Sequence, residues 1–150
     1  MDMTKGEYAS VLQNILKLHT QEAIDKIINI KRILPEKACI AEVGIHPTQD
    51  EEGMFSIIVH LCGPDLYLLN QVIAPYRVLF DVKDSEGKLQ PDVPLFFPEE
   101  TSFSVNDLIV EVSINWVQEI WALSGGLGIP AYTFGEECSN PEGLISLKSM

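Results

Sequence analysis

One stretch of the chain, from Ser104 to Gly126, carries apolar residues on two faces of a helix. The first face holds Val105, Leu108, Ile109, Val112, Trp116, Ile120 and Leu123, and the second holds Val110, Ile114, Val117 and Trp121. Only a narrow polar stripe remains, formed by Asp107, Glu111, Asn115 and Gln118. A helix with so little polar surface must be covered by a sheet on one side and by another element or subunit on the other. Ser104 is the expected N-cap, and Gly125 supplies a left-handed stop.

The N-terminal segment predicts an amphipathic helix over residues 5–33, because apolar residues follow a helical face and Pro35 ends the pattern. Thr4 and Glu7 form a capping box at its start. A bend is expected near His19, where Thr20 would cap a second segment. We expect His19 to be a partly buried, hydrogen-bonded residue and not a ligand.

The pattern then changes to alternation. Residues 39–46 and 54–61 predict two strands joined by a polar turn, and therefore an antiparallel hairpin. Because the first strand ends where the second begins, His46 and His60 are expected near opposite ends of the hairpin, which argues against a two-histidine metal site. A short helix is predicted to begin over 63–71 and to stop at Pro75, and further strands are predicted over 76–82, 127–134 and 144–147. This order favours a single α+β domain over residues 1–150, with an antiparallel or mixed sheet, a long N-terminal helix and the central two-faced helix packed on it.

The segment 90–100 contains three prolines and is expected to be an extended connection. Its apolar triplet, 95–97, either tucks beneath the central helix or stays on the surface as a binding patch rimmed by Glu99 and Glu100. The tucked alternative is favoured, because phenylalanines in a loop commonly fill the edge of a core.

Acidic residues outnumber basic ones by 22 to 10 across the chain. From Gln90 onward there are nine carboxylates and one lysine, so this part alone carries a net charge of −8. Such a charge repels nucleic acid and anionic membranes and attracts a basic partner. The alternative is that the charge serves solubility alone.

Three cysteines, Cys39, Cys62 and Cys138, cannot all pair within one chain, which favours a reducing cytoplasmic location. The N-terminus lacks the pattern of an export signal, and no apolar stretch is long enough to span a membrane.

A search for catalytic signatures gives no phosphate-binding glycine loop, no nucleophile elbow and no zinc-binding spacing. Alternation places His60 and Cys62 on one face of their strand, which fits a structural pair as well as a dyad. We therefore expect no catalytic residues, no metal and no cofactor.

Short sequence segments spread along most of the chain resemble a small bacterial family of uncharacterised domains. They lie at 63–70, 79–82, 93–96, 105–107 and 116–121. This resemblance implies no catalytic residue. In general type the chain also resembles the immunity proteins that neighbour bacterial polymorphic toxins, which are small, acidic and cytosolic.

Three functions remain open. The first is a non-enzymatic binding protein, an immunity or antitoxin-like inhibitor that occludes the active site of a basic toxin. Its expected partner-binding residues are Glu99, Glu100, Glu136 and Glu137, with Phe96, Phe97 or Tyr132 as apolar anchors. The second is a homodimeric structural or regulatory subunit, suggested by the two-faced helix. The third is an enzyme with His46 or His60 beside Asp81.

Overall fold

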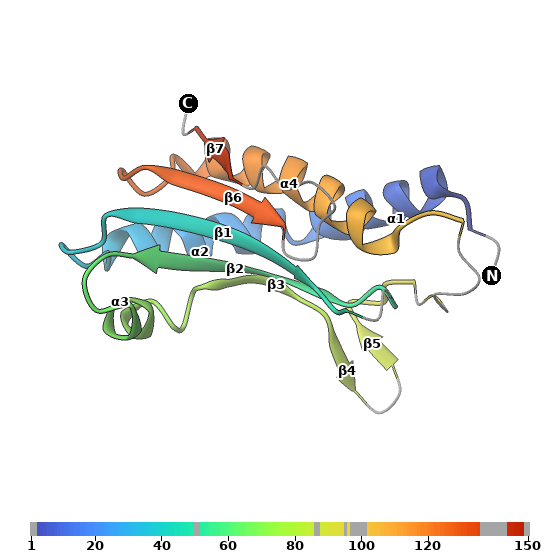
Figure 1. Ribbon diagram of the computed structural model, residues 1–150, viewed down its shortest axis with the longest axis horizontal. Helices are drawn as coiled ribbons and strands as arrows, with labels where there is room; N and C mark the ends of the chain where they lie inside the picture. Colours follow the sequence, from blue (N-terminus) through green and yellow to red (C-terminus); the bar gives the residue numbers. More distant parts are fainter. Residues whose placement is uncertain are drawn as a thin grey trace.

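A five-stranded sheet with helices packed on one face forms the body of the computed structural model (Figure 1). The structure describes residues 3–49, 52–85, 88–94, 96, 102–135 and 144–148. The strand order is β3-β2-β1-β6-β7, with bounds Ile40–Pro47 (β1), Phe55–Cys62 (β2), Val78–Asp81 (β3), Ala131–Gly135 (β6) and Ile145–Leu147 (β7). A separate pair, β4 (Lys83–Ser85) and β5 (Lys88–Gln90), forms a small two-stranded sheet that extends from β3.

The sheet is mixed because β1 and β6 are parallel, whereas the other neighbouring strands are antiparallel. β1 and β2 form the predicted hairpin, with Ile40 opposite Cys62 and Pro47 opposite Phe55. Burial alternates along β2, so one face of the sheet lies in the core and the other is more open. The predicted strands are otherwise displaced by a few residues: β3 begins two residues later than expected, and β6 begins only after Pro130.

The predicted N-terminal helix is divided into α1 (Lys5–Leu18) and α2 (Thr20–Arg32), with His19 between them. The capping box of Thr4 and Glu7 is present. The prediction that Thr20 caps α2 is wrong. Its hydroxyl instead donates to the Leu16 carbonyl at 3.4 Å and accepts from Trp116 Nε1 at 3.0 Å, which ties the bend to the central helix.

The central helix is α4 (Val105–Ser124), with Ser104 as its N-cap and Gly125 in a left-handed conformation at its end, as predicted. One side of α4 packs against β1, β6 and β7, and α1 and α2 pack against its other side. Both apolar faces of α4 are therefore covered within one chain, and the pattern that suggested a subunit contact is explained by α1 and α2. Leu123 departs from the prediction, since its side chain is 62% exposed.

These features confirm the predicted fold class: one α+β domain in which the long helix α4 packs against α1 and α2 on one face of a mixed sheet. The remaining helix, α3 (Leu66–Val72), is short and lies apart from this layer, at one end of β2 (Figure 1). In the parts of the chain that the structure describes, no helix has both the length and the apolar character needed to cross a membrane.

Candidate functional site

The outer edge of β2 is completed by two side chains where β3 does not reach. Asn70 of α3 accepts from the Leu61 amide at 2.8 Å and donates to the Leu61 carbonyl at 3.1 Å, so its amide group takes the place of a neighbouring strand. Arg77 donates from Nε to the Val59 carbonyl at 3.1 Å, and its own carbonyl accepts from the Val59 amide. Asn70 also donates to the Leu66 carbonyl of α3 at 2.9 Å. These contacts fix α3 and Arg77 against the sheet.

A chain of hydrogen bonds continues from Arg77 across the open face of the sheet. Arg77 Nη2 lies 2.8 Å from His60 Nδ1, and His60 Nε2 lies 3.0 Å from His46 Nε2. The strand register places the two residues near opposite ends of the hairpin, as predicted, with His46 opposite Ser56 and His60 opposite Glu42, yet their rings meet. The reason is Gly44, which lies between them in β1: a Cβ at this position would be 2.5 Å from His46 Nε2, so only a glycine leaves room for the His46 ring to lie back over the strand.

The hydrogen-bond donor beside His60 decides which tautomer its neutral ring adopts. A guanidinium has no acceptor, so His60 Nδ1 must accept, and the proton of a neutral His60 is on Nε2. His46 Nε2 then accepts that proton's hydrogen bond. A metal ion on His60 Nε2 would need Nδ1 to carry a proton, which the Arg77 contact opposes. Within the described residues there is also no group of three potential metal ligands. The two histidines thus act as a hydrogen-bonded support for Arg77.

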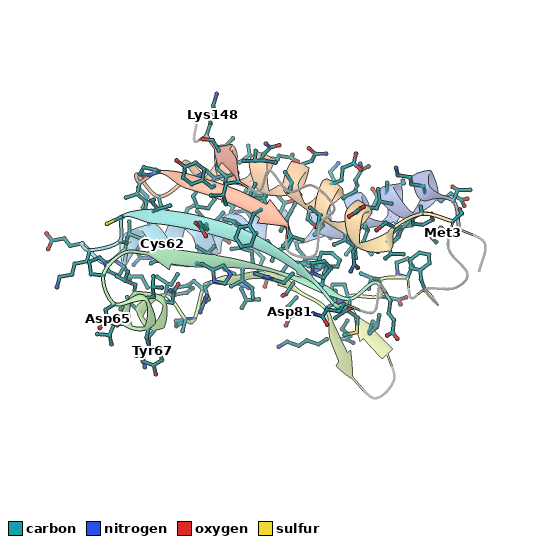
Figure 2. The ribbon with its side chains drawn as sticks, in the orientation of Figure 1. Met3, Cys62, Asp65, Tyr67, Asp81 and Lys148 are labelled. Atoms are coloured by element: carbon teal, nitrogen blue, oxygen red, sulfur yellow. The ribbon has the colours of Figure 1, made fainter. Side chains whose placement is uncertain are left out.

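The helix α3 presents an unusual amount of apolar surface. Ten large apolar side chains are exposed in the described residues, and four of them belong to this seven-residue helix. We call them the α3 surface: Leu66 (56% exposed), Tyr67 (74%), Leu68 (54%) and Val72 (48%). Tyr67 points away from the body of the protein (Figure 2). Several large apolar side chains exposed on one short helix are more typical of an interaction site than scattered single ones.

A cavity of about 380 Å³ lies between α3 and the start of β3. Its lining, which we call the Arg77 cavity, consists of Leu66, Tyr67, Asn70, Gln71, Ala74 and Arg77. Arg77 is the only charged residue among them. It is half-buried, and desolvation lowers the pKa of its guanidinium from its ordinary value. No carboxylate of the described residues forms an ion pair with Arg77.

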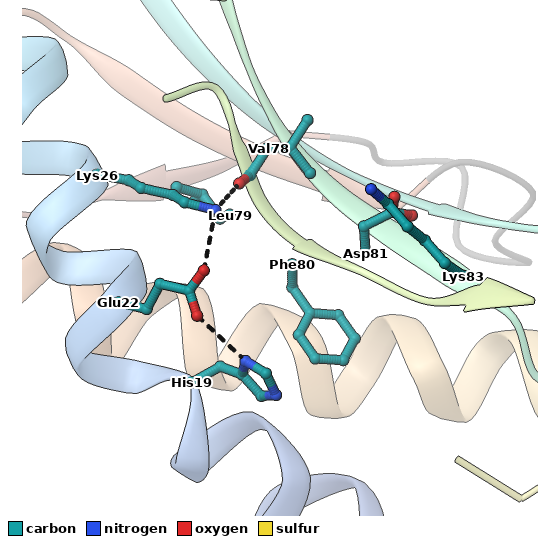
Figure 3. A pocket seen from close by; sticks show the side chains of 8 residues that line it. All are labelled: His19, Glu22, Lys26, Val78, Leu79, Phe80, Asp81 and Lys83. Carbon is teal, nitrogen blue, oxygen red and sulfur yellow. Dashed lines mark hydrogen bonds and ion pairs between the residues drawn. The ribbon is translucent and has the colours of Figure 1, made fainter. Parts of the chain in front are cut away.

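A second cavity, of about 320 Å³, opens between α2 and β3 (Figure 3). Lys26 Nζ donates to the Val78 carbonyl at 2.7 Å and lies 3.4 Å from Glu22, whose other oxygen is 3.5 Å from His19 Nδ1. The Lys26 charge lowers the pKa of Glu22. These groups satisfy one another, and the His19 ring packs edge-on against Phe80, so His19 is a partly buried, hydrogen-bonded residue as predicted.

Asp81 lines this second cavity together with His19. Across the sheet it is opposite Ser56, which is in turn opposite His46. The His46 side chain is directed over Gly44 toward His60, and so along β1 away from this row. The structure therefore places Asp81 with His19, whereas His46 and His60 join Arg77.

His60 and Cys62 share the outer face of β2, as alternation predicts. Burial raises the pKa of the Cys62 thiol, and the neighbouring Glu42 carboxylate raises it further. A raised pKa keeps the thiol protonated and weakly nucleophilic. Cys39 and Cys62 are free thiols, and Cys138 lies outside the described residues.

The predicted partner-binding residues are distributed differently from the α3 surface. Phe96 is 7% exposed and packs edge-on against Tyr8, with ring centroids 4.7 Å apart, so this residue of the apolar triplet is tucked into the core and is not a surface anchor. Tyr132 is half-buried on the outer face of the sheet. Glu99, Glu100, Glu136, Glu137 and Phe97 lie outside the described residues.

Sequence reasoning missed the α3 surface and Arg77, although a signal was present. A seven-residue helix can bury only one narrow face, and here Leu69 is that face, with Ile73 just beyond the end of the helix. The remaining large apolar residues must then be exposed. Between Pro64 and Tyr76 the only charged residue is Asp65, in a chain of which 21% is charged. An uncharged apolar segment too short to bury itself is therefore the pattern that points to this site.

No curated protein and no solved structure matches the chain. A family model described as a family of unknown function (DUF6389) matches residues 3–149, and the chain belongs to this family.

Proposed function

We propose that this protein is a non-enzymatic binding protein that engages a partner protein through the α3 surface. The observation that supports the proposal is the exposure of Leu66, Tyr67, Leu68 and Val72 on one short helix. Burying apolar area of this kind favours association by roughly 25 cal/mol for each Å² removed from water. Aromatic and large aliphatic residues are also those that commonly dominate the free energy of binding.

The position of α3 favours binding without rearrangement. Asn70 fixes the helix to β2 by hydrogen bonds at 2.8 and 3.1 Å, so the exposed side chains are held on a structured element. A surface that is already ordered loses less conformational entropy when a partner binds.

The charge of the chain favours a basic partner. The formal net charge is −12, and charge complementarity accelerates encounter with a partner of opposite sign. In its more specific form, our proposal is that the partner is a basic toxin domain and that the protein inhibits it by covering its active site, as an immunity protein would. Glu99, Glu100, Glu136 and Glu137 would add charged contacts to the apolar ones of α3.

Affinity capture from the organism's own cells tests the proposal. The tagged protein is compared with the double variant Leu66→Ser/Tyr67→Ser at low salt and at about 0.5 M salt, where exposed charge pairs are strongly screened. Leu123→Ser is the matched control, because Leu123 is 62% exposed on α4 and lies outside the α3 surface. We expect one basic protein to be captured by the wild type and the control, less at high salt, and lost with the double variant.

Two results would overturn the proposal. Equal capture by the double variant and the control would exclude the α3 surface as the contact. Capture of the protein alone, together with a mass of about twice 16.7 kDa by light scattering, would favour the homo-oligomeric alternative instead.

A further inference from the structure

The Arg77 cavity has the chemistry of a site for a carboxylate that is carried by an apolar group. A guanidinium has five N–H donors. Arg77 uses Nε for the Val59 carbonyl and one N–H of Nη2 for His60 Nδ1. Three N–H groups remain, and no described carboxylate pairs with the charge.

The surroundings of Arg77 favour an anion over other ligands. Among the described residues that line the cavity there is no second charged one, and the Asn70 amide group is already hydrogen-bonded to Leu61 and Leu66. Arg77 is half-buried, and the resulting loss of solvation lowers the pKa of its guanidinium. Charge-assisted bonds to a guanidinium are strong and are often bidentate when the acceptor is a carboxylate.

We propose that the Arg77 cavity binds the carboxylate side chain of a partner protein's Asp or Glu while a neighbouring large apolar residue of that partner packs on Leu66 and Tyr67. This inference rests on the proposed function, because it names the chemistry by which the α3 surface recognises its partner.

A protein segment fits this site better than a free anion. The chain carries a net charge of −12, which lowers the concentration of small anions around it. A carboxylate must therefore gain additional free energy from contacts beside the charge. The exposed apolar side chains of Leu66 and Tyr67, which line the same cavity, supply those contacts.

The test uses two capped peptides, acetyl-Ser-Leu-Glu-Phe-Gly-amide and the same peptide with Gln in place of Glu. Each is titrated into the ¹⁵N-labelled full chain while the Arg77 Nε–H signal and the α3 amide signals are followed by NMR. We expect saturable shifts of both sets of signals, with the Glu peptide binding about tenfold more tightly than the Gln peptide. Sodium acetate at the same concentration is expected to cause much smaller shifts, since it lacks the apolar contacts.

Equal affinity of the two peptides would overturn the inference, and so would acetate shifts as large as those of the Glu peptide. Tyr67→Ser should lower the affinity for the Glu peptide several-fold, and Leu123→Ser should leave that affinity unchanged. Arg77→Lys keeps the charge but loses the paired N–H donors of the guanidinium. It should therefore lower the affinity for the Glu peptide to nearly that for the Gln peptide. Because Arg77 also supports Val59 and His60, a variant that fails to fold is replaced by the two-peptide comparison on the wild type.

Failure of this inference is distinguishable from failure of the proposed function. A captured partner that depends on α3, together with equal binding of the two peptides, refutes the carboxylate site alone. A clear preference for the Glu peptide, with no partner captured, refutes the proposed function and leaves the chemistry of the cavity in place.

Discussion

Replacing Asn70 with alanine should loosen α3 from the sheet, because its side chain makes three hydrogen bonds, two of them to β2 and one within α3. Two of them satisfy the amide and carbonyl of Leu61, and the third holds the Leu66 carbonyl. The Leu61 side chain is 1% exposed, and both of these hydrogen bonds are partly buried. A typical hydrogen bond contributes about 1 kcal/mol net, and an unsatisfied buried group costs about 1–3 kcal/mol. We therefore expect Asn70→Ala to lower the free energy of unfolding by about 2–3 kcal/mol.

The matched control is Asn115→Ala on the exposed side of α4. Both substitutions replace a helical asparagine with alanine, so both gain the same helix propensity, roughly 0.5 kcal/mol, and the difference between them isolates the bonds to Leu61 and Leu66. Urea unfolding measures the free energies, and hydrogen exchange measures the protection of the Leu61 amide. Equal stabilities of the two variants, or unchanged protection of Leu61, would refute the argument that Asn70 acts as a substitute strand.

Three further predictions follow from the other contacts. Gly44→Ala should separate the two histidine rings, because its Cβ would lie 2.5 Å from His46 Nε2, and ¹⁵N imidazole shifts should then show a changed tautomer at unchanged fold. Tyr8→Phe should leave stability within about 0.5 kcal/mol or raise it, since the Tyr8 hydroxyl is buried without a described partner and removing such a group costs little; a loss above about 1 kcal/mol in urea unfolding would contradict this. Glu22→Gln should remove a small, pH-dependent contribution to the free energy of unfolding, because Lys26 lowers the folded-state pKa of Glu22. This contribution is present above the ordinary carboxyl range and is lost as the pH falls through the lowered pKa. Because Glu22 is exposed, the difference between variant and wild type in thermal unfolding should be under about 0.5 kcal/mol near neutral pH and should vanish in acid; an unchanged difference in acid would contradict the assignment.

Much of the fold was predictable because it depends on local pattern. The two faces of α4 followed from helical spacing, and its ends followed from Ser104 and Gly125. The β1–β2 hairpin followed from alternation on both sides of a polar turn. The identity of the elements that cover α4 was left open, because a helical pattern records that a face is buried and not what buries it.

The candidate site was less predictable because it depends on contacts between side chains from different elements. The meeting of His46 with His60 requires a ring to lie back over Gly44, which strand register alone does not reveal. The use of Asn70 and Arg77 to complete β2 depends on where β3 begins, which was misplaced by two residues. Phe96 was correctly expected to be tucked, but its partner Tyr8 lies on α1, far away in the sequence.

The central claim is that a partner protein docks on the α3 surface, and a photo-crosslinking amino acid tests it most directly. It is placed at Tyr67, which is 74% exposed on α3, and as a control at Leu18, which is 84% exposed at the end of α1. Both proteins are irradiated in the organism's own cells, and the products are identified by mass spectrometry. We predict that Tyr67 gives one dominant crosslink to a second protein and that Leu18 does not. Identical crosslinking at the two positions, or none at Tyr67, would contradict the account.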